Sequence, residues 1–224
     1  MSIKYEIDEI KAIVGRTLAN LVAFQGMIAG RAGAELRYIC GDLAARTATY
    51  LVDGTFANRL LSCFLIATQA GINLDGMDRV IQQLTQETPS SLTSTSVVQN
   101  SLIFALAQEG RIIAATTYVS RNDVDSTMKR MKAWFDIIKD IIADSMSGPS
   151  YESFVGLAAG ITRYLTDTGR PLPRLLHYQM LSPLPALAAS QLIYGDGSRD
   201  EELAAENKVV HPAFCRMQIR ALSA

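Results

Sequence analysis

Apolar residues recur at intervals of three and four along most of the first 168 residues, which is the spacing of amphipathic helices. In the N-terminal stretch the repeat runs from Ile7 to Leu21, and Gly26, Gly30 and Gly33 then interrupt it. A glycine costs a helix interior about 1 kcal/mol relative to alanine, so a bend or break is expected there. The pattern predicts helices over residues 5–50 (one or two helices), 55–70, 73–86, 97–119, 123–145 and 150–166.

Residues that commonly begin and end helices support these boundaries. Gly71 follows the second predicted helix, where glycine is favoured as a C-terminal cap. Residues with short polar side chains stand before the later helices, where they are favoured as N-caps. The expected N-caps are Asn73 or Asp75, Asn122 or Asp123, and Ser150.

The segment 123–145 carries the most regular pattern in the chain. Its apolar stripe predicts either a helix buried in a core or a surface that binds another helix, and Trp134 and Phe135 are the candidate partner contacts on it. Basic residues lie mostly off the stripe, where they form a solvated face or contact a phosphate backbone. The stripe comprises Val124, Met128, Met131, Phe135, Ile138 and Ile142.

Between two predicted helices, residues 87–96 are rich in serine and threonine. A polar run of this kind is typical of a loop. It is the best candidate for a mobile internal linker, and it marks a possible subdivision of the helical region.

The pattern changes after residue 168, where Gly169, Pro171 and Pro173 end helicity. A strand is predicted over residues 175–180, and a helix capped by Ser182 follows, with Pro183 and Pro185 in its first turn. After a turn at residues 195–197, the capping-box spacing of Ser198 and Glu201 predicts a second helix that ends near Asn207. Residues 217–222 alternate as a final strand. The prediction is a mainly α protein, with a helical domain over 1–168 and a small βααβ module over 169–224.

The composition of the chain limits the classes of function that it can have. Charged residues make up 19% of the chain, below the usual quarter, which suggests that much of the surface is buried against partners. The net charge is −1, so no global field attracts nucleic acid. The three cysteines lack metal-site spacing and are expected to be buried and reduced, as in a protein made inside the cell. No apolar run is long enough to span a membrane, and residues 1–8 lack a signal-peptide pattern.

Candidate catalytic chemistry is sparse. The two histidines, His177 and His211, lie on a predicted strand and in a turn before Pro212. Either is a possible base or an ordinary structural residue. The acidic residues between Asp196 and Glu206 either attract a cation or form a solvated helix surface. No cluster has zinc-ligand spacing. We therefore expect no enzyme activity, no metal and no cofactor.

The C-terminal segment resembles the LysM domain, whose core runs strand, helix, helix, strand. The resemblance rests on Tyr194-Gly195-Asp196, Asn207, Pro212 and Gln218, which occupy the places of that domain's usual motif residues. The segment departs from the domain at Ser182-Pro183-Leu184-Pro185, where a LysM domain carries Gly-Asp-Thr-Leu, and at Met217, where glycine is usual. The resemblance implies a compact βααβ fold and, in many members, peptidoglycan binding.

A wider resemblance covers about residues 97–224. The following pieces are together similar to the C-terminal end of the Mu-like phage DNA circularisation protein family: Arg170-Pro171-Leu172-Pro173-Arg174, Leu184-Pro185-Ala186-Leu187, Leu192 to Asp196, Glu201 to Ala204, Asn207 and His211-Pro212. The β-rich N-terminal domain of that family is not visible in this chain.

The family implies a structural component of a contractile tail baseplate that joins hub and wedge subunits by protein contacts. Several copies would be arranged around a symmetric virion assembly after synthesis in the host cytoplasm. The candidate module-defining or partner-contact residues are Pro183, Pro185, Tyr194, Asp196, Asn207, His211, Pro212, Trp134 and Phe135. Two alternatives are a peptidoglycan-binding LysM protein and a protein that binds DNA ends.

Overall fold

The computed structural model describes residues 3–23, 30–143 and 148–223. These residues are mainly helical, with a small two-stranded sheet near the C-terminus, as the sequence predicts at this coarse level. The chain divides into two compact units. Unit 1 comprises residues 1–116 and 133–161, and unit 2 comprises residues 117–132 and 162–224. The proposed domain boundary at residue 168 stays a prediction.

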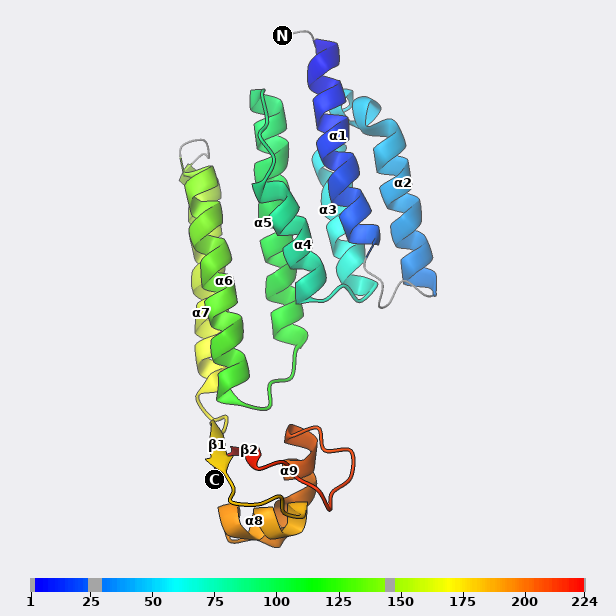
Figure 1. The fold of residues 1–224 in the computed structure, drawn as a ribbon. Helices are drawn as coiled ribbons and strands as arrows, with labels where there is room; N and C mark the ends of the chain where they lie inside the picture. The colour runs from blue at the N-terminus through cyan, green and yellow to red at the C-terminus, as the bar shows by residue number, and fades with distance from the viewer. Residues whose placement is uncertain (1–2, 24–29, 144–147, 224) are drawn as a thin grey trace. The chain divides into compact units, whose positions relative to one another are not determined.

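Unit 1 is a helical bundle. Its helices α1 to α5 pack against one another in Figure 1, with α1 in contact with α2, α3, α4 and α5. Large side chains fill its interior, and Phe64 of α3 lies edge-on to Phe104 of α5 with ring centroids 6.1 Å apart. The bounds are α1 (Ile3–Val22), α2 (Arg31–Val52), α3 (Phe56–Gln69), α4 (Leu74–Thr85) and α5 (Leu92–Ala115).

Several of the predicted boundaries in unit 1 are confirmed. Gly71, just after α3, has a φ of 94°, a conformation that glycine adopts without strain. The side chain of Asn73 caps α4 by accepting a hydrogen bond from the Gly76 N–H. Gly30 precedes α2, Gly33 lies buried within it, and Gly26 falls outside the described residues.

The prediction of a serine- and threonine-rich linker over residues 87–96 is wrong for its second half. Residues 92–96 form the first turns of α5, because Ser91 and Ser94 make a reciprocal capping box. The Ser91 hydroxyl accepts from the Ser94 N–H at 3.1 Å, and the Ser94 hydroxyl accepts from the Ser91 N–H at the same distance. Ser94 is fully buried. Residues 87–91 are non-helical, as predicted, whereas residues 92–96 belong to the helix, and α5 ends at Ala115 rather than near residue 119.

Helices α6 (Arg121–Ile142) and α7 (Gly148–Gly169) each contribute residues to both units. The predicted cap of α6 is wrong by two or three residues. Ser120 takes that role, and its hydroxyl accepts from the Asp123 N–H. The Asp123 carboxylate accepts in return from the Ser120 N–H and hydroxyl. Helix α7 begins at Gly148, so the expected cap Ser150 lies inside it. The expected end at Ser145 falls outside the described residues.

Unit 2 contains the two strands, β1 (Leu175–Gln179) and β2 (Gln218–Leu222), which pair antiparallel with His177 opposite Arg220 and Gln179 opposite Gln218. Between them come α8 (Ala186–Tyr194), the short 3₁₀ helix η1 (Gly197–Arg199) and α9 (Asp200–Glu206). Helix α9 contacts both α8 and β2. The small core holds Ala186, Ala189, Leu203, Cys215, Ile219 and Ala221.

Two local predictions in unit 2 are wrong. Helix α8 begins at Ala186, so Pro183 precedes the helix and Pro185 is its N-cap residue. The reason is that the segment before α8 pairs with another loop, through the Cys215 N–H donating to the Leu184 carbonyl at 2.9 Å. The Ser198–Glu201 capping box does not form either. Asp196 caps η1 instead, by accepting from the Ser198 N–H at 2.8 Å.

Candidate functional site

The outer edge of β2 is covered by side chains of its own module. The Asn207 carbonyl oxygen accepts from the Arg220 N–H at 2.8 Å, and the Asn207 amide donates to the Arg220 carbonyl at 2.7 Å. The same amide donates to the Leu203 carbonyl at the end of α9. One asparagine thus replaces a neighbouring strand for Arg220 and joins α9 to the sheet. Asn207, which the sequence marked as module-defining, therefore has a structural role, because its hydrogen bonds hold α9 against β2.

Tyr194 covers the next position along that edge. Its hydroxyl accepts from the Leu222 N–H at 3.2 Å and reaches the Glu202 carboxylate at 3.3 Å. The Arg199 guanidinium lies over the ring, 3.8 Å from the centroid, and donates to Glu202 at 2.7 Å. Burial, followed by the nearby Glu202 charge, raises the pKa of Tyr194. This cluster holds α8, η1 and α9 against β2.

The remaining candidates of the module shape its turns. Gly195 ends α8 with a φ of 71°, and the Asp196 carbonyl accepts from the buried Ser190 hydroxyl. The hydrogen bonds from the Ser198 N–H and hydroxyl lower the pKa of Asp196. The Pro212 carbonyl accepts from the Ala186 N–H at 2.6 Å, which fixes the start of α8.

The candidates Pro183, Pro185, His211 and Pro212 are exposed on loops, and Asp196 is exposed in the turn after α8. The His211 ring lies 5.7 Å from that of Phe214, centroid to centroid. The structure therefore brings Tyr194, Asp196 and Asn207 into one folded framework and places the proline and histidine candidates on its surface loops.

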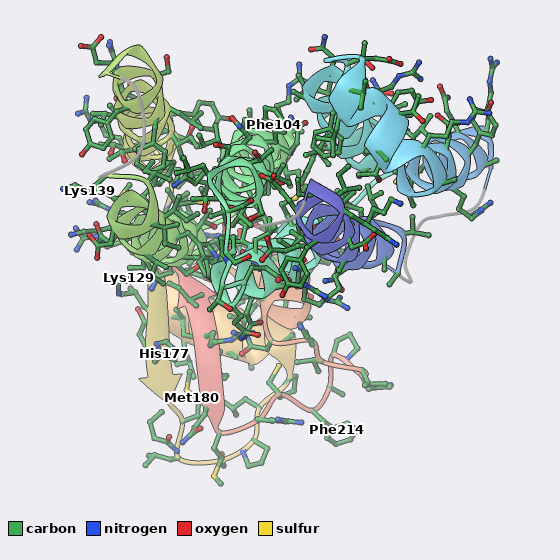
Figure 2. All side chains as sticks on the ribbon, turned by 90° about the horizontal axis from the view of Figure 1, so that it is seen from above. Phe104, Lys129, Lys139, His177, Met180 and Phe214 are labelled. Carbon is green, nitrogen blue, oxygen red and sulfur yellow. The ribbon has the colours of Figure 1, made fainter. Side chains whose placement is uncertain are left out.

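The uncovered face of the sheet forms a groove of about 710 Å³. Side chains alternate along a strand, and since Ile219 and Ala221 face the small core, His177, Gln179, Gln218 and Arg220 lie on the opposite face. Figure 2 shows His177 on β1 and Phe214 on the far side of β2. The groove is lined by His177, Tyr178, Gln179, Asn207, Lys208, Arg216, Gln218, Ile219 and Arg220.

The groove is basic, with three cations and no carboxylate in its lining. Arg220 is partly neutralised, because its guanidinium donates to the Glu206 carbonyl at 2.7 Å and lies 3.6 Å from the Glu206 carboxylate. Lys208 and Arg216 are exposed and make no ion pair with any described residue. The lining presents hydrogen-bond donors and positive charge, which suit an anionic group. Sequence reasoning missed this site, although every charged residue after Glu206 is basic.

Exposed apolar side chains gather beside the groove. Residues 180–186 and 212–217 run alongside each other, joined by hydrogen bonds from Met180 to Met217 and from Cys215 to Leu184. Leu181, Phe214 and Met217 on these paired loops are exposed, and Leu181 is as exposed as a free side chain. We call the side chains of Leu181, Val210, Phe214 and Met217 the apolar loop surface.

The two candidates of α6 lie in unit 1. The Trp134 indole N–H donates to the Asp78 carboxylate of α4 at 2.8 Å. Phe135 is 8% exposed and packs on Phe154 of α7, with ring centroids 5.3 Å apart. Both side chains therefore serve packing inside unit 1, and contact with a partner stays a prediction for them.

Within residues 3–23, 30–143 and 148–223, no group of three or more His, Cys, Asp and Glu side chains is placed to hold a metal ion. None of the helices in these ranges is both long and apolar enough to cross a membrane. All three cysteines are buried and free, as expected.

Comparisons with family models and with curated proteins identified no relative of this chain. No family model matches the chain, and no curated protein matches it.

Proposed function

We propose that the protein is a structural component of a contractile phage tail or a related particle, and that its C-terminal module binds neighbouring protein subunits. The observation that carries the proposal is the distribution of exposed large apolar side chains. Among the described residues, eight of the sixteen lie between Leu176 and Met217, a segment that is less than a fifth of the chain. Exposed apolar surface of this density is typical of a protein interface.

The finer proposal is that this module is LysM-like and acts as a joint between hub and wedge subunits of a baseplate. Support comes from the order strand, helix, helix, strand, and from the positions of Tyr194 and Asn207, which fasten α8 and α9 to β2. Pro183 and Leu184 stand where LysM domains carry the polar residues Asp and Thr at this turn. This favours protein over glycan as the ligand.

The proposal is tested by asking whether the chain is part of an assembled particle. Phage-like particles from the native host are purified by sedimentation, and their proteins are quantified by mass spectrometry. We expect this chain at a fixed ratio to the tail tube and sheath proteins, in several copies per particle. Its absence from intact particles overturns the proposal.

A variant series locates the contact on the molecule. Leu181→Ser with Phe214→Ser removes two members of the apolar loop surface and is expected to reduce incorporation at least tenfold. Both side chains are exposed, at 103% and 72%, so folding should be preserved. Val52→Ser is the matched control, because Val52 is equally exposed in unit 1, at 81%, and its loss should leave incorporation unchanged.

A further inference from the structure

The acidic residues of the C-terminal module are confined to one stretch of the chain. From residue 169 onward they all fall between Asp196 and Glu206, whereas every charged residue after Glu206 is a cation, namely Lys208, Arg216 and Arg220; Arg170 and Arg174 precede the stretch and Arg199 lies within it. Most of the acidic residues have roles within the module: Asp196 caps η1, Glu202 pairs with Arg199, and Glu206 pairs with Arg220. The two that remain are Asp200 and Glu201.

Asp200 and Glu201 begin α9, and neither makes an ion pair with a described residue. Helix α9 has seven residues, so its two ends are about 10 Å apart. The groove lies at the other end, beside Asn207 and Lys208, and its lining includes neither Asp200 nor Glu201. The free carboxylates and the free cations of one module therefore do not meet, and both are available to another molecule.

The groove suits a protein carboxylate better than a nucleic acid. Lys208 and Arg216 are the two groove cations without an ion-pair partner among the described residues, and Arg220 is already held by Glu206. About two phosphate contacts provide only a weak affinity for a duplex, because that affinity grows with the number of phosphates neutralised, and the chain's net charge of −1 opposes a longer contact. Two side-chain carboxylates, in contrast, match two guanidinium or ammonium donors one to one.

We propose that this groove binds the acidic first turn of α9 from a second copy of the chain. Asp200 and Glu201 of one molecule then pair with Lys208 and Arg216 of the next, while Gln179 and Gln218 supply further hydrogen bonds from the sheet face. The two surfaces lie at different ends of α9, so the contact repeats from copy to copy or closes into a ring or reciprocal dimer.

This inference deepens the proposed function and rests on it for its biological context, because a baseplate component is used in several copies. The two are tested separately. Particle incorporation tests the function, whereas self-association of the purified full chain tests the contact. A chain that enters particles yet never self-associates would overturn this inference alone.

The test is sedimentation of the purified chain over a concentration series, at about 0.05 M and about 0.5 M salt, where charge pairs are weakly and strongly screened. We expect a mass above that of the 24.4 kDa chain at low salt, and a shift toward monomer at high salt. Lys208→Glu with Arg216→Glu should be monomeric, and so should Asp200→Lys with Glu201→Lys. Each variant places like charges on both surfaces.

The decisive experiment mixes the Lys208→Glu with Arg216→Glu variant and the Asp200→Lys with Glu201→Lys variant. Each now carries the charges that the other lacks, so the mixture should associate although neither variant does so alone. Lys129→Glu with Lys132→Glu makes the same change in net charge at exposed positions outside the groove, and it should associate like the wild type. Circular dichroism confirms that every variant is folded.

Three outcomes overturn the proposal: a wild-type chain that stays monomeric at low salt, variants that associate like the wild type, or a mixture that remains monomeric. Binding of a labelled duplex that the Lys208→Glu with Arg216→Glu change abolishes, in a chain without self-association, would assign the groove to phosphate instead.

Discussion

The bundle of unit 1 and the C-terminal module of unit 2 achieve folded structure in different ways. The twelve largest fully buried side chains of the described residues, among them Phe64, Met77 and Leu106, all belong to helices α1 to α5. The module has a core of six residues, of which three are alanines and one is a cysteine. The bundle therefore depends on apolar volume, whereas the module has little of it.

Polar side chains compensate for the small core of the module. Asn207, Tyr194, Ser190 and Asp196 each bond to backbone groups at the ends of helices or at the edge of β2. The apolar side chains of the paired loops, Leu181, Phe214 and Met217, are exposed and do not enlarge this core. The module thus holds its fold largely by side-chain hydrogen bonds where the bundle relies on buried apolar side chains, and the following changes test that contrast.

The largest effect is expected from Phe64→Ala in the bundle. Phe64 is completely buried, and its loss removes apolar contacts and leaves a cavity, at a cost of roughly 3–5 kcal/mol in the free energy of unfolding. Chemical denaturation measures that change. The exposed Tyr38→Ala, at 74% exposure, is the control and should change little. A loss below about 1 kcal/mol for Phe64→Ala would contradict an apolar basis for the bundle's stability.

The next effect is expected from Asn207→Asp in the module. The aspartate keeps the acceptor for the Arg220 N–H but loses both donor bonds and places a carboxylate against two carbonyl groups. We expect a local loss of about 2–3 kcal/mol. Hydrogen exchange should quicken in β1, β2 and α9 and stay unchanged in α1 to α5.

Asn122→Asp is the matched control for that substitution. Asn122 only accepts, from the Leu175 N–H at 2.9 Å, and an aspartate accepts equally well. Faster exchange in the control to the same degree as in Asn207→Asp would show that added charge, rather than loss of the two donor bonds, weakens the module.

A smaller effect is expected from Tyr194→Phe, which keeps the ring under Arg199 and removes the hydroxyl that accepts from Leu222. The loss should be about 1 kcal/mol, again confined to the module by hydrogen exchange. Tyr178→Phe provides the comparison, because the Tyr178 hydroxyl makes no hydrogen bond with a described residue. Equal effects of the two changes would rule out the hydroxyl as the cause.

The smallest effect is expected in the bundle, from Glu87→Gln. Arg16 donates two hydrogen bonds to Glu87, at 2.8 and 2.6 Å, and they lower the pKa of that carboxyl. Arg16 is half exposed, so the pair contributes about 0.5–1 kcal/mol near neutral pH.

The pH dependence of this pair has a definite sign. Because the folded pKa of Glu87 lies below its unfolded value, the contribution is present above the unfolded pKa and is lost as the pH falls through the folded pKa. Denaturation of wild type and Glu87→Gln should therefore differ at neutral pH and converge in acid. A double-mutant cycle with Arg16→Gln should show the two changes to be non-additive.

Much of the architecture was predictable from local sequence. The periodicity that marked α3, α4 and α6 reports which face of each helix is buried, and burial is what makes those helices stable. The short segment 175–180 after the proline-rich stretch and the alternation at residues 217–222 predicted both strands to within one residue. Gly71 and Asn73 were predicted correctly because the preference of glycine for positive φ and of asparagine for the N-cap depends on neighbouring backbone alone.

The errors arose where two local solutions compete. Ser198 and Glu201 have the spacing of a capping box, yet the Ser198 N–H donates to the Asp196 carboxylate instead of to Glu201. The polar run at residues 87–96 has the composition of a loop, yet Ser91 and Ser94 cap each other and begin a helix. Pro185 is compatible with a first helical turn, but pairing of Leu184 with Cys215 holds the segment extended. Energies of about 1 kcal/mol separate such alternatives, and composition does not rank them.

The helical class and the two strands could be read from the sequence, because they follow from periodicity and backbone preference, whereas Tyr194 and Asn207 were singled out by the resemblance to LysM domains. The closing of the β2 edge by Asn207, the burial of Phe135, and the placing of Lys208, Arg216 and Arg220 in one groove became visible in the folded structure alone. These three cations are as many as twelve residues apart along the chain. Antiparallel pairing and the end of α9 bring them together, and contacts between distant residues are not encoded in any local pattern.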